Sequence, residues 1–410
     1  MEEWISKIAN KAKELANINL CDHCLGRMFG KVGTGMTNDI RGMKIRVTLE
    51  EIFVSTANKP DEPCILCKGI FNELNRYADA IVETISAVES KNFLVGSRVD
   101  PEIIKKEKDI QEKFQLKQCE SIKSEINREV GKLVLSAINR PVEFKSPQVV
   151  ACVDTRFASV TLDIAPIFIH GYYNKLSREI PQTIWPCRIC HGKGCGRCHG
   201  TGKMYQTSVQ EEIGNIALRM FNGENHFFHG MGREDIDALC LGKGRPFVLE
   251  ISNPRIREID LNDLEIQANT SKVAQFHCLQ FVDKDTVRKV KMATPTKVYK
   301  LRVRANSKVN KEAIDEAISS LSNVCVSQRT PKRVEHRRAD LVRSKMIHWI
   351  EVGKVEDCTF DIALEAESGT YVKEFISGDG GRTKPNFSDA LGVQCTVEAL
   401  DVVAINEEIK

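Results

Sequence analysis

The spacing of hydrophobic residues changes along this chain and divides it into three blocks. In the first block, residues 1–70, apolar residues at helical spacing, Trp4, Ile5 and Ile8, predict an amphipathic helix near the start. A glycine-rich and then helical stretch follows, and it lies between two pairs of cysteines.

Residues 71–182 form the second block, in which helical and strand patterns come in runs rather than in strict alternation. Helices are expected at 74–88 and 105–138, and strands at 92–96, 149–154 and 158–164. Helices that pack beside a sheet in this order are typical of an α+β module.

The third block, residues 208–410, is richer in strand patterns. Strands are expected at 246–251, 298–305 and 359–366, and helices at 209–221 and 311–321. Apolar and β-branched residues alternate or cluster over strand length in these segments. We therefore predict a mainly antiparallel mixed sheet with helices packed outside it, within a multidomain α+β protein.

Eight of the 15 cysteines form two quartets, each made of two close pairs. The quartets are Cys21, Cys24, Cys64 and Cys67, and Cys187, Cys190, Cys195 and Cys198. A Cys-x-x-Cys pair presents two sulfurs to one tetrahedral ion at about 2.3 Å. The sequence therefore predicts about two structural zinc ions, one in a zinc-ribbon-like segment at 1–70 and one in a zinc knuckle or linker at 183–207.

Other roles for these residues are open from the sequence. Disulfides are one alternative, but the chain shows no secretory apolar segment and no apolar run long enough to span a bilayer. This favours a reducing, cytoplasmic compartment. His23, His191 or His199 would each be able to replace a thiol as ligand. In the second quartet, glycines follow the thiols and permit positive-φ turns that aim backbone N–H groups at thiolates.

The overall charge does not by itself identify a partner. The chain has 59 Lys and Arg residues against 56 Asp and Glu, a formal net charge of +3, which is too small to predict nucleic-acid binding. Locally, residues 328–345 gather cations with few acids, among them Arg333, Arg337 and Arg338. Such a cluster suits phosphate contacts, and a solvated helix face is the alternative.

A second unusual segment lies at 230–247, where glycines bracket an Arg-Glu-Asp-x-Asp core. Its carboxylates, Glu234, Asp235 and Asp237, adjoin an arginine, so one of them could face a substrate while a cation keeps it ionised. A solvated acidic turn is the alternative. The glycines do not form a nucleotide-binding fingerprint, because the spacing and the following helix are missing and no P-loop motif occurs.

Four groups of residues together resemble one enzyme family. They are Gly232-Arg-Glu-Asp-x-Asp with Leu241-Gly-x-Gly-Arg-Pro-Phe, Tyr299-x-Leu, Gln328-x-Thr-Pro-x-Arg-Val-x-His-Arg-Arg-Ala-Asp, and Gly369-Thr-Tyr-Val-Lys-Glu-Phe. In these motifs the chain resembles the archaeal branch of the tRNA pseudouridine synthases that modify T-loop uridines fifty-four and fifty-five. The resemblance implies a zinc-bearing accessory domain with a THUMP-like RNA-binding module at 71–182, followed by a catalytic domain at 208–410.

The resemblance also implies roles for single residues. It assigns the catalytic aspartate to Asp235, the active-site tyrosine to Tyr299, the basic partner of the aspartate to Lys373, and an apolar pocket residue to Leu400. Substrate contacts are expected from Arg233, Arg245, Tyr299, Arg333, Arg337, Arg338, Tyr371 and Leu400.

Two further expectations come from the same resemblance. The segments 93–97 and 166–173 would fall in the THUMP-containing region. One position departs from the family pattern, since Leu239 stands where the family usually carries arginine.

The implied activity is the isomerisation of uridine to pseudouridine in the T-loop of tRNA. The target base must leave its stack before the C1′–N1 bond breaks and C5 joins C1′. Asp235 would act as nucleophile or as the base of a glycal route, Lys373 would keep that carboxylate charged, and Tyr299 would stack on uracil. The expected partner is tRNA, held at its T-arm and acceptor end, with no organic cofactor, membrane or obligate protein partner.

Two non-catalytic alternatives are also considered. The segment 187–202 resembles half of the zinc region of J-domain co-chaperones, which would make the chain a zinc-containing chaperone-like or RNA-binding module. No His-Pro-Asp tripeptide of a J-domain is present. A catalytically inactive tRNA-binding protein of the same fold is the other alternative, and the joint presence of Asp235, Tyr299 and Lys373 argues against it.

Overall fold

The computed structural model describes residues 3–33, 35–53 and 63–406. The chain folds into two compact units, Met1–Ala165 and Pro166–Lys410, called here the N-terminal and C-terminal units. No helix among the described residues is long and apolar enough to cross a membrane.

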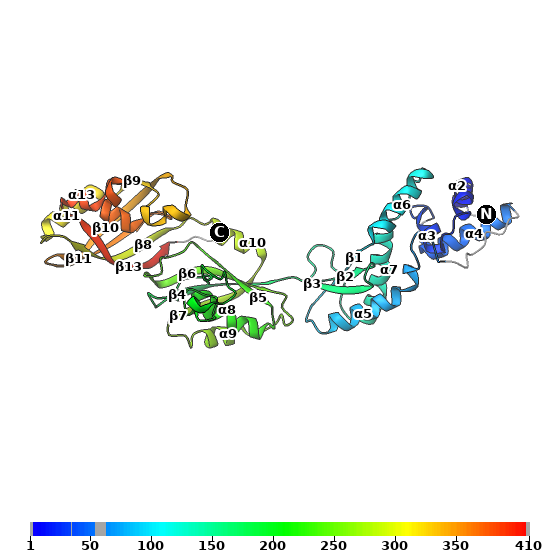
Figure 1. The fold of residues 1–410 in the computed structure, drawn as a ribbon, viewed down its shortest axis with the longest axis horizontal. Coiled ribbons are helices and arrows are strands. Elements are labelled where there is room, and N and C mark those ends of the chain that lie inside the picture. The colour runs from blue at the N-terminus through cyan, green and yellow to red at the C-terminus, as the bar shows by residue number, and fades with distance from the viewer. Residues whose placement is uncertain (1–2, 34, 54–62, 407–410) are drawn as a thin grey trace. The chain divides into compact units, whose positions relative to one another are not determined.

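The N-terminal unit is an α+β module with a three-stranded sheet (Figure 1). Its elements are α1 (Glu3–Ser6), α2 (Ala9–Ala16), α3 (Asp22–Arg27), α4 (Asn38–Phe53), η1 (Ile70–Asn72), α5 (Leu74–Ser86), β1 (Leu94–Arg98), α6 (Pro101–Lys113), α7 (Ile122–Ala137), β2 (Val149–Asp154) and β3 (Ser159–Ile164). Strand β2 lies between β1 and β3, parallel to β1 and antiparallel to β3. Helices α5 and α7 pack against each other and against this sheet.

Apolar periodicity accounts for α7, because four residues that recur every four positions are all buried: Ile122, Ile126, Val130 and Val134. The single helix expected at 105–138 is wrong. The structure has two helices there, because Gln115 adopts a left-handed φ of 51° just after α6 and Ser121 caps the start of α7. The helix expected at 74–88 and the strands expected at 149–154 and 158–164 are confirmed as α5, β2 and β3.

The segment that carries the first cysteine quartet is helical. Its described residues, 3–33, 35–53 and 63–70, form helices and turns and no strand, so the structure differs from the zinc-ribbon form expected from the sequence. Cys21 is the N-cap of α3, and its thiol accepts a hydrogen bond from the N–H of Cys24. The Cys-x-x-Cys spacing is therefore met by the first turn of a helix rather than by a hairpin.

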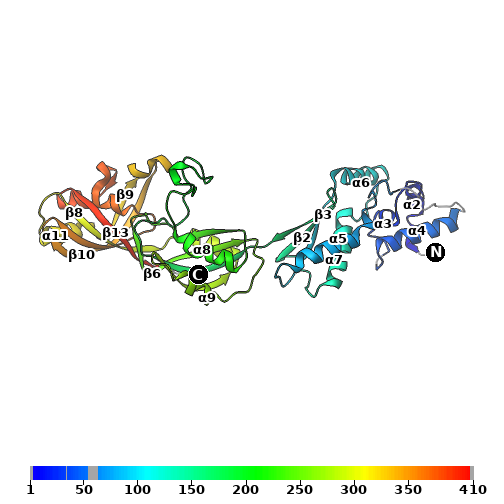
Figure 2. The ribbon, with the colours of Figure 1, turned by 60° about the horizontal axis from the view of Figure 1, so that its bottom comes forward.

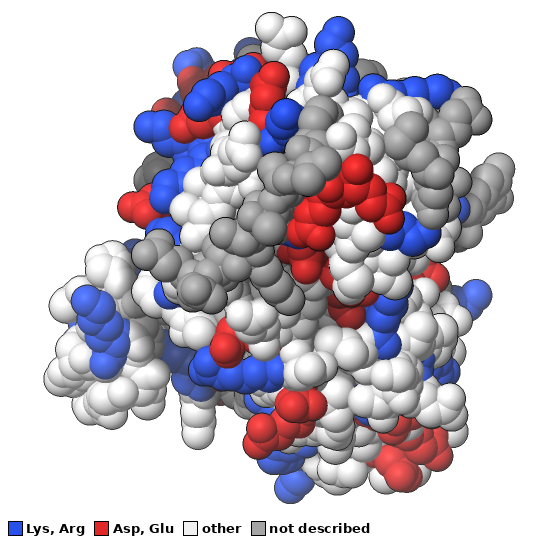
Figure 3. Space-filling view, turned by 90° about the vertical axis from the view of Figure 1, so that its right-hand side faces the viewer, with Lys and Arg blue, Asp and Glu red and all other residues white. Residues whose placement is uncertain are grey.

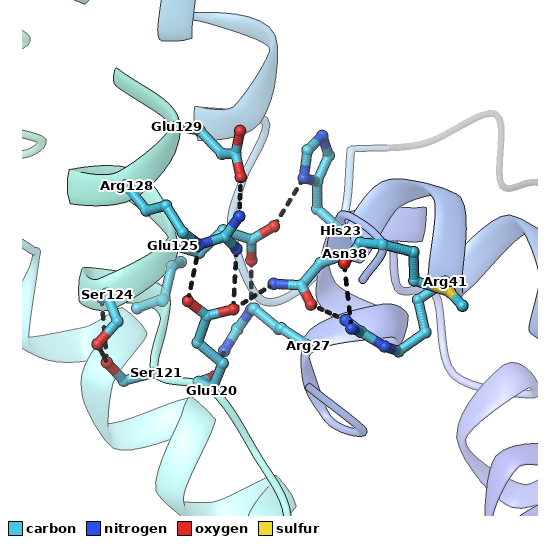
Figure 4. Close-up of polar contacts among 12 residues, drawn as sticks. His23, Arg27, Asn38, Arg41, Glu120, Ser121, Ser124, Glu125, Arg128 and Glu129 are labelled. Carbon is cyan, nitrogen blue, oxygen red and sulfur yellow. Dashed lines mark hydrogen bonds and ion pairs between the residues drawn. The ribbon is translucent and has the colours of Figure 1, made fainter. Parts of the chain in front are cut away.

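A buried polar network joins this segment to α6 and α7 (Figure 4). His23 Nδ1 lies 2.8 Å from Oε1 of Glu125, a fully buried carboxylate. The guanidinium of Arg27, also fully buried, pairs with Glu107 and lies 3.9 Å from Glu125. Because buried charges are costly unless they are paired, these contacts hold α3 in one position on α6 and α7.

Surface charge does not mark a single binding face on the part of the molecule in Figure 3. Lys and Arg side chains lie beside Asp and Glu side chains over that face. The mixture agrees with the small net charge of the sequence, +3. An RNA-binding surface must therefore be located from specific residues rather than from net charge.

The C-terminal unit contains a ten-stranded sheet and the second cysteine quartet. Its elements are β4 (Ile167–Lys175), η2 (Gly196–Cys198), α8 (Val209–Met220), β5 (Asn225–Gly230), β6 (Leu239–Ser252), α9 (Leu261–Ala268), β7 (Ala274–Val282), α10 (Lys284–Met292), β8 (Thr296–Ala305), α11 (Lys311–Leu321), β9 (Val324–Arg329), η3 (Lys332–Arg337), β10 (Val342–Glu356), β11 (Thr359–Ala366), α12 (Val372–Ser377), η4 (Gly378–Gly381), β12 (Thr383–Lys384), α13 (Phe387–Leu391) and β13 (Cys395–Asn406).

The sheet is mixed and mainly antiparallel, as predicted. The strand order is β12-β9-β10-β11-β8-β13-β6-β4-β7, with β5 paired to β6. Strands β13 and β6 pair in parallel at Asp401 opposite Leu239, and the other described neighbours are antiparallel. Helices α8 and α9 pack against β5 to β7, and α11 lies on β10 (Figures 1 and 2). Helix α12 packs against β13.

Strand β4 belongs to this large sheet, between β6 and β7. The placement of 166–173 in the THUMP-containing region is therefore wrong, and the units divide after Ala165 rather than at the sequence-based boundary of 182. An interior strand is buried on both faces, as β4 is over most of its length. Its first three residues, Ile167, Phe168 and Ile169, form an unbroken apolar run, and such a run does not show which sheet the strand joins.

Candidate active site

The segment 231–238 forms the loop between β5 and β6, here called the catalytic loop. The Nζ atom of Lys175, a fully buried side chain, donates to the carbonyl oxygens of Ile180, Asp235 and Ile236 at 3.0, 3.2 and 2.6 Å. Buried carbonyl groups require such donors. Lys175 thus fixes the backbone that carries Asp235, and the segment is not a solvated acidic turn.

A buried ion pair supports the same loop. Glu234 Oε2 lies 2.9 Å from Nε of Arg245, and both side chains are 1% exposed. Tyr173 donates its hydroxyl to this carboxylate at 2.8 Å, and Arg245 donates to the carbonyl of Met231 at 2.8 Å. Burial would lower the pKa of Arg245, but the charge of Glu234 raises it above its usual value. The predicted substrate-binding Arg245 is thus engaged by the protein itself.

The carboxylate of Asp235 lies between two cations. Its Oδ2 atom is 3.1 Å from Nη1 of Arg333 and 3.7 Å from Nζ of Lys373. Arg333 also contacts Glu374, Nε to Oε1, at 2.6 Å. Sequence reasoning named Lys373 as the basic partner and assigned Arg333 to the substrate. It missed Arg333 as the nearer partner of Asp235, because ninety-eight positions separate the two residues.

Lys373 makes its closest ion pair with Asp237, at 2.8 Å from Oδ2. Burial alone would raise the pKa of Asp237, but the hydrogen bond and charge of Lys373 lower it below its usual value. Lys373 therefore bridges both aspartates of the Arg-Glu-Asp-x-Asp motif.

These side chains line one pocket of about 240 Å³. It brings together Asp235, Tyr299 and Lys373, from the catalytic loop, β8 and α12. Among its lining residues, six are basic and two are acidic: Arg233, Arg245, Lys297, Arg333, Arg338 and Lys373 against Glu234 and Asp235. Such an excess of positive charge suits an anionic substrate.

Tyr299 and Leu400 form an apolar part of this pocket, and they are 8% and 9% exposed. Burial raises the pKa of Tyr299 to about 12, although the charge of Arg245 opposes the shift. The phenol is therefore neutral at pH 7 and keeps its proton as a hydrogen-bond donor.

Tyr371 also lines the pocket, at the start of α12. Its backbone is held by the buried side chain of Gln328, which donates to the carbonyl of Tyr371 at 3.0 Å and accepts from its N–H at 2.9 Å. The amide of Gln328 thus links β9 to α12.

The remaining predicted arginines have different surroundings. The guanidinium of Arg233 lies 5.6 Å from the ring centre of Trp185, within cation–π distance. Arg338 lines the pocket. The side chain of Arg337 lies outside the described part of the chain.

Leu239, at the position where the resemblance implies arginine, is half-buried at the start of β6. Its N–H donates to Oδ1 of Asp401, and Arg178 pairs with the same oxygen at 2.6 Å. Arg178 also donates to the carbonyl of Asp237 at 2.8 Å. A guanidinium from the segment after β4 thus holds this end of the catalytic loop.

Gly242 and Gly244 lie within β6 with positive φ, 63° and 77°. A Cβ atom on Gly242 would lie 2.1 Å from the carbonyl oxygen of Val403. The absence of a side chain on Gly242 therefore permits the close approach of β6 and β13.

The second cysteine quartet has the geometry of a tetrahedral metal site. Its sulfur–sulfur separations are 3.9 Å for Cys187 and Cys195, 3.8 Å for Cys190 and Cys198, and 3.7 Å for Cys195 and Cys198. Four thiolates at about 2.3 Å from one ion would be about 3.8 Å apart. The four sulfurs therefore fit a single bound metal ion.

Glycines shape this second quartet as expected. Gly194 and Gly202 have positive φ, and their N–H groups donate to the sulfurs of Cys190 and Cys198 at 3.2 Å. Such donors stabilise thiolate ligands.

The first quartet brings Cys21 and Cys67 within 3.6 Å of each other. In both quartets the four sulfurs all lie within 4.8 Å of one another, so each group is able to hold a metal ion. The imidazole of His23 is not needed as a ligand here, since it pairs with Glu125. The two groups of potential ligands among the described residues consist of cysteines alone.

Two family models match this chain. The model described as "Pus10, C-terminal" matches residues 168–406, and the model described as "Pus10 THUMP domain, archaeal" matches residues 77–154. The first coincides with the C-terminal unit and the second lies within the N-terminal unit.

Two curated proteins named tRNA pseudouridine synthase Pus10 are similar to this chain over nearly their whole length. The protein of Methanothrix thermoacetophila is 39% identical, over 94% of this chain and 91% of its own length. The protein of Pyrococcus furiosus is 37% identical, over 98% and 99%.

Among solved structures, one chain of the "Crystal Structure of a Cbf5-Nop10-Gar1 Complex" aligns with 49% of this chain, and the alignment covers 46% of that structure's chain. The sequence identity is 16% and the TM-score is 0.32, which is too low to support an inference. The family models and the curated relatives cover both units of this chain. The chain therefore belongs to the Pus10 family of tRNA pseudouridine synthases.

Proposed function

We propose that this protein converts uridine to pseudouridine in the T-loop of tRNA, at position fifty-four, fifty-five or both. The observation that carries the proposal is the meeting of Asp235, Tyr299 and Lys373 in one positively charged pocket. These residues come from three distant parts of the chain. A structural role for any one of them would not require the other two.

The reaction begins when the target nucleotide leaves its stack and enters the pocket. Asp235 then attacks C1′, or removes a proton from the sugar in a glycal route, and the C1′–N1 bond breaks with its electron pair on the base. Arg333 and Lys373 lie beside the carboxylate and place positive charge next to it. The base turns and C5 joins C1′, while the bond between Asp235 and C1′ breaks or, in the glycal route, the proton returns to the sugar. The proton then leaves C5, and N1 takes up a proton.

Tyr299 is placed to contact the base. Its ring lies in the buried part of the pocket, and its phenol keeps its proton at pH 7 because the pKa is about 12. A neutral phenol offers a flat surface for stacking and a donor that assists proton movement at C5.

The N-terminal unit would bind another part of the same tRNA. The match of residues 77–154 to an archaeal THUMP model supports an RNA-binding role for this unit. In a folded tRNA the acceptor end is far from the T-loop. An accessory unit on the acceptor end and a catalytic pocket on the T-loop would together recognise the shape of the tRNA.

The decisive experiment is to incubate the protein with an unmodified tRNA transcript and to map pseudouridine chemically. Pseudouridine at T-loop position fifty-four or fifty-five is expected. Modification confined to other parts of the tRNA, or none, would contradict the proposal.

Each cysteine quartet is proposed to hold one structural zinc ion. The sulfur separations of the second quartet support tetrahedral thiolate coordination, and four protein ligands leave no open position for chemistry. The need for eight reduced thiols is consistent with a cytoplasmic location.

Metal analysis of freshly purified, reduced protein is expected to find about two zinc ions per chain. Chelation should loosen the N-terminal unit first, because the buried Cys24, Cys64 and Cys67 belong to its hydrophobic core. Limited proteolysis during chelator titration would measure the order. A metal content near zero would contradict the assignment.

Substitution of Cys187 and Cys190 by serine is expected to lower stability more than turnover, because that metal serves the architecture of the knuckle. Cys278, an exposed cysteine outside both quartets, provides the control. The same substitution at Cys278 should leave metal content and melting temperature unchanged.

Affinity for tRNA is expected to fall steeply with salt, because cations of the segment 328–345 displace counterions from phosphates. Reversal of charge at Arg337 and Arg338 should weaken binding and flatten the slope of log K against log salt by about two. Reversal at Lys308 and Lys311, two exposed cations beyond the end of β8, is the matched control. If the slope is unchanged in the arginine variant, the segment 328–345 is a solvated face.

A further inference from the structure

Lys297 is a buried lysine of the pocket to which the proposed reaction assigns no task. It lies on β8 two positions before Tyr299, so both side chains point to the same face of the sheet. The residue is 6% exposed and lines the pocket. Its Nζ atom makes a long hydrogen bond of 3.4 Å to Ser368. Within the described residues, no carboxylate lies within ion-pair distance of it.

The ammonium of Lys297 lies against the catalytic loop. Gly232 has a φ of 72°, and a Cβ atom at this position would lie 3.2 Å from Nζ of Lys297 and 3.5 Å from Nη1 of Arg245. The absence of a side chain on Gly232 therefore leaves space for both cations beneath the backbone that leads to Asp235.

The charge of Lys297 is not balanced by the protein. Glu234 acts on Lys297 through its charge but does not pair with it, and the Oε2 atom of Glu234 pairs with Arg245 and accepts the hydrogen bond of Tyr173. Burial, and next the charge of Arg245, lower the pKa of Lys297 to about 8. Below that pH the pocket holds a buried cation without a counter-ion, which costs stability. A substrate that brings negative charge to Nζ would offset this cost.

The position of Lys297 in the pocket favours the base over the phosphates. Asp235, which must reach C1′ of the sugar, is 36% exposed, and Arg333 beside it is 38% exposed. Lys297 is far more buried than either. With the sugar at Asp235 and the phosphates toward solvent, the uracil is the part of the nucleotide that extends to Lys297 and Tyr299.

We propose that Lys297 is a further catalytic residue, whose ammonium donates a hydrogen bond to a carbonyl oxygen of the target uracil and stabilises the negative charge on the base after the C1′–N1 bond breaks. This inference rests on the proposed function. The electron pair of the broken bond spreads over N1 and the carbonyl oxygens, and it is returned when C5 bonds to C1′. Lys297 keeps its proton throughout, so the proton lost from C5 and the proton gained at N1 still balance.

The first test is Lys297→Met in single-turnover assays on unmodified tRNA transcript at pH 7. The rate is expected to fall about 100-fold, as on removal of one preorganised donor from an oxyanion site. The dissociation constant for tRNA should stay within about threefold. The melting temperature should be unchanged or higher, because an unpaired buried charge is removed. Lys300→Met, at an exposed lysine on the opposite face of β8, is the matched control and should behave as wild type.

The second test is the pH dependence of the wild-type single-turnover rate. The ionisable groups that act on Lys297 are Arg245, Glu234, Cys240 and Lys345. If the ammonium is required, the rate should fall as the pH rises through about 8, where Lys297 loses its proton. The residual rate of Lys297→Met should lack this decline.

The outcomes separate this inference from the proposed function. If the wild type makes no pseudouridine, the proposed function fails and the inference fails with it. If the wild type is active, a rate loss below about tenfold in Lys297→Met would overturn the inference alone, since it is less than one such donor contributes. A loss caused by weaker tRNA binding or a lower melting temperature, or a wild-type rate that is flat above pH 8, would also overturn it.

Discussion

Asp235→Asn is expected to abolish pseudouridine formation while tRNA affinity stays within a few-fold. An amide neither attacks C1′ nor removes a proton from the sugar, so the chemical step loses its essential group. Affinity should change little, because few phosphate contacts are expected to pass through this carboxylate. Chemical mapping of pseudouridine together with a tRNA binding assay would measure both quantities.

Asp361→Asn is the matched control for this variant. Asp361 lies on β11 and pairs with Arg302, and neither residue lines the pocket of Asp235. The same chemical change there should leave activity at the wild-type level. Measurable pseudouridine formation by Asp235→Asn would refute the catalytic assignment.

Arg245→Met is expected to destabilise the protein by about 3–5 kcal/mol, because it leaves the carboxylate of Glu234 buried without its cation. The pair is 1% exposed on both sides, so water cannot replace the lost partner. Denaturant unfolding would measure the change. Activity should fall as well, since Arg245 also holds the carbonyl of Met231 at the start of the catalytic loop.

The double variant Glu234→Gln, Arg245→Met distinguishes two causes of the lost stability. One is the loss of the ion pair itself, and the other is the unpaired buried carboxylate that remains in Arg245→Met. It should recover part of the stability lost in Arg245→Met, because a neutral amide is easier to bury than a carboxylate. Arg302→Met, which breaks an ion pair of partly exposed side chains, should change stability little. Equal losses in the single and double variants would show that Glu234 does not depend on Arg245.

Local patterns in the sequence were sufficient to predict many of the helices and strands. The helix at 311–321 and the strand at 359–366 occur with the predicted bounds, because burial of one face leaves a period of 3.6 or 2 in the residues. The prediction of one continuous helix at 105–138 was wrong, because charged residues continue across the break near Gln115. The backbone turns there without a glycine or proline.

The candidate site could be predicted only in part. Asp235, Tyr299 and Lys373 were identified from short motifs, and they do line one pocket. Lys297 could have been found from the same strand, because Lys-Val-Tyr in a strand places the lysine and the tyrosine on one face. The proposed role of Lys297 depends on the burial of its side chain, and no local sequence pattern shows that burial.

The sequence by itself determined the identity of the chemical groups: two cysteine quartets, the Arg-Glu-Asp-x-Asp loop, and the alternation that makes β8 and β11 strands. Only the tertiary structure decided their partners. It paired Asp235 with Arg333, Lys373 with Asp237, and Glu234 with Arg245, and it placed β4 in the large sheet. The physical reason is that ion pairs and strand pairing depend on the distance between atoms in space, which short-range periodicity along the chain does not contain.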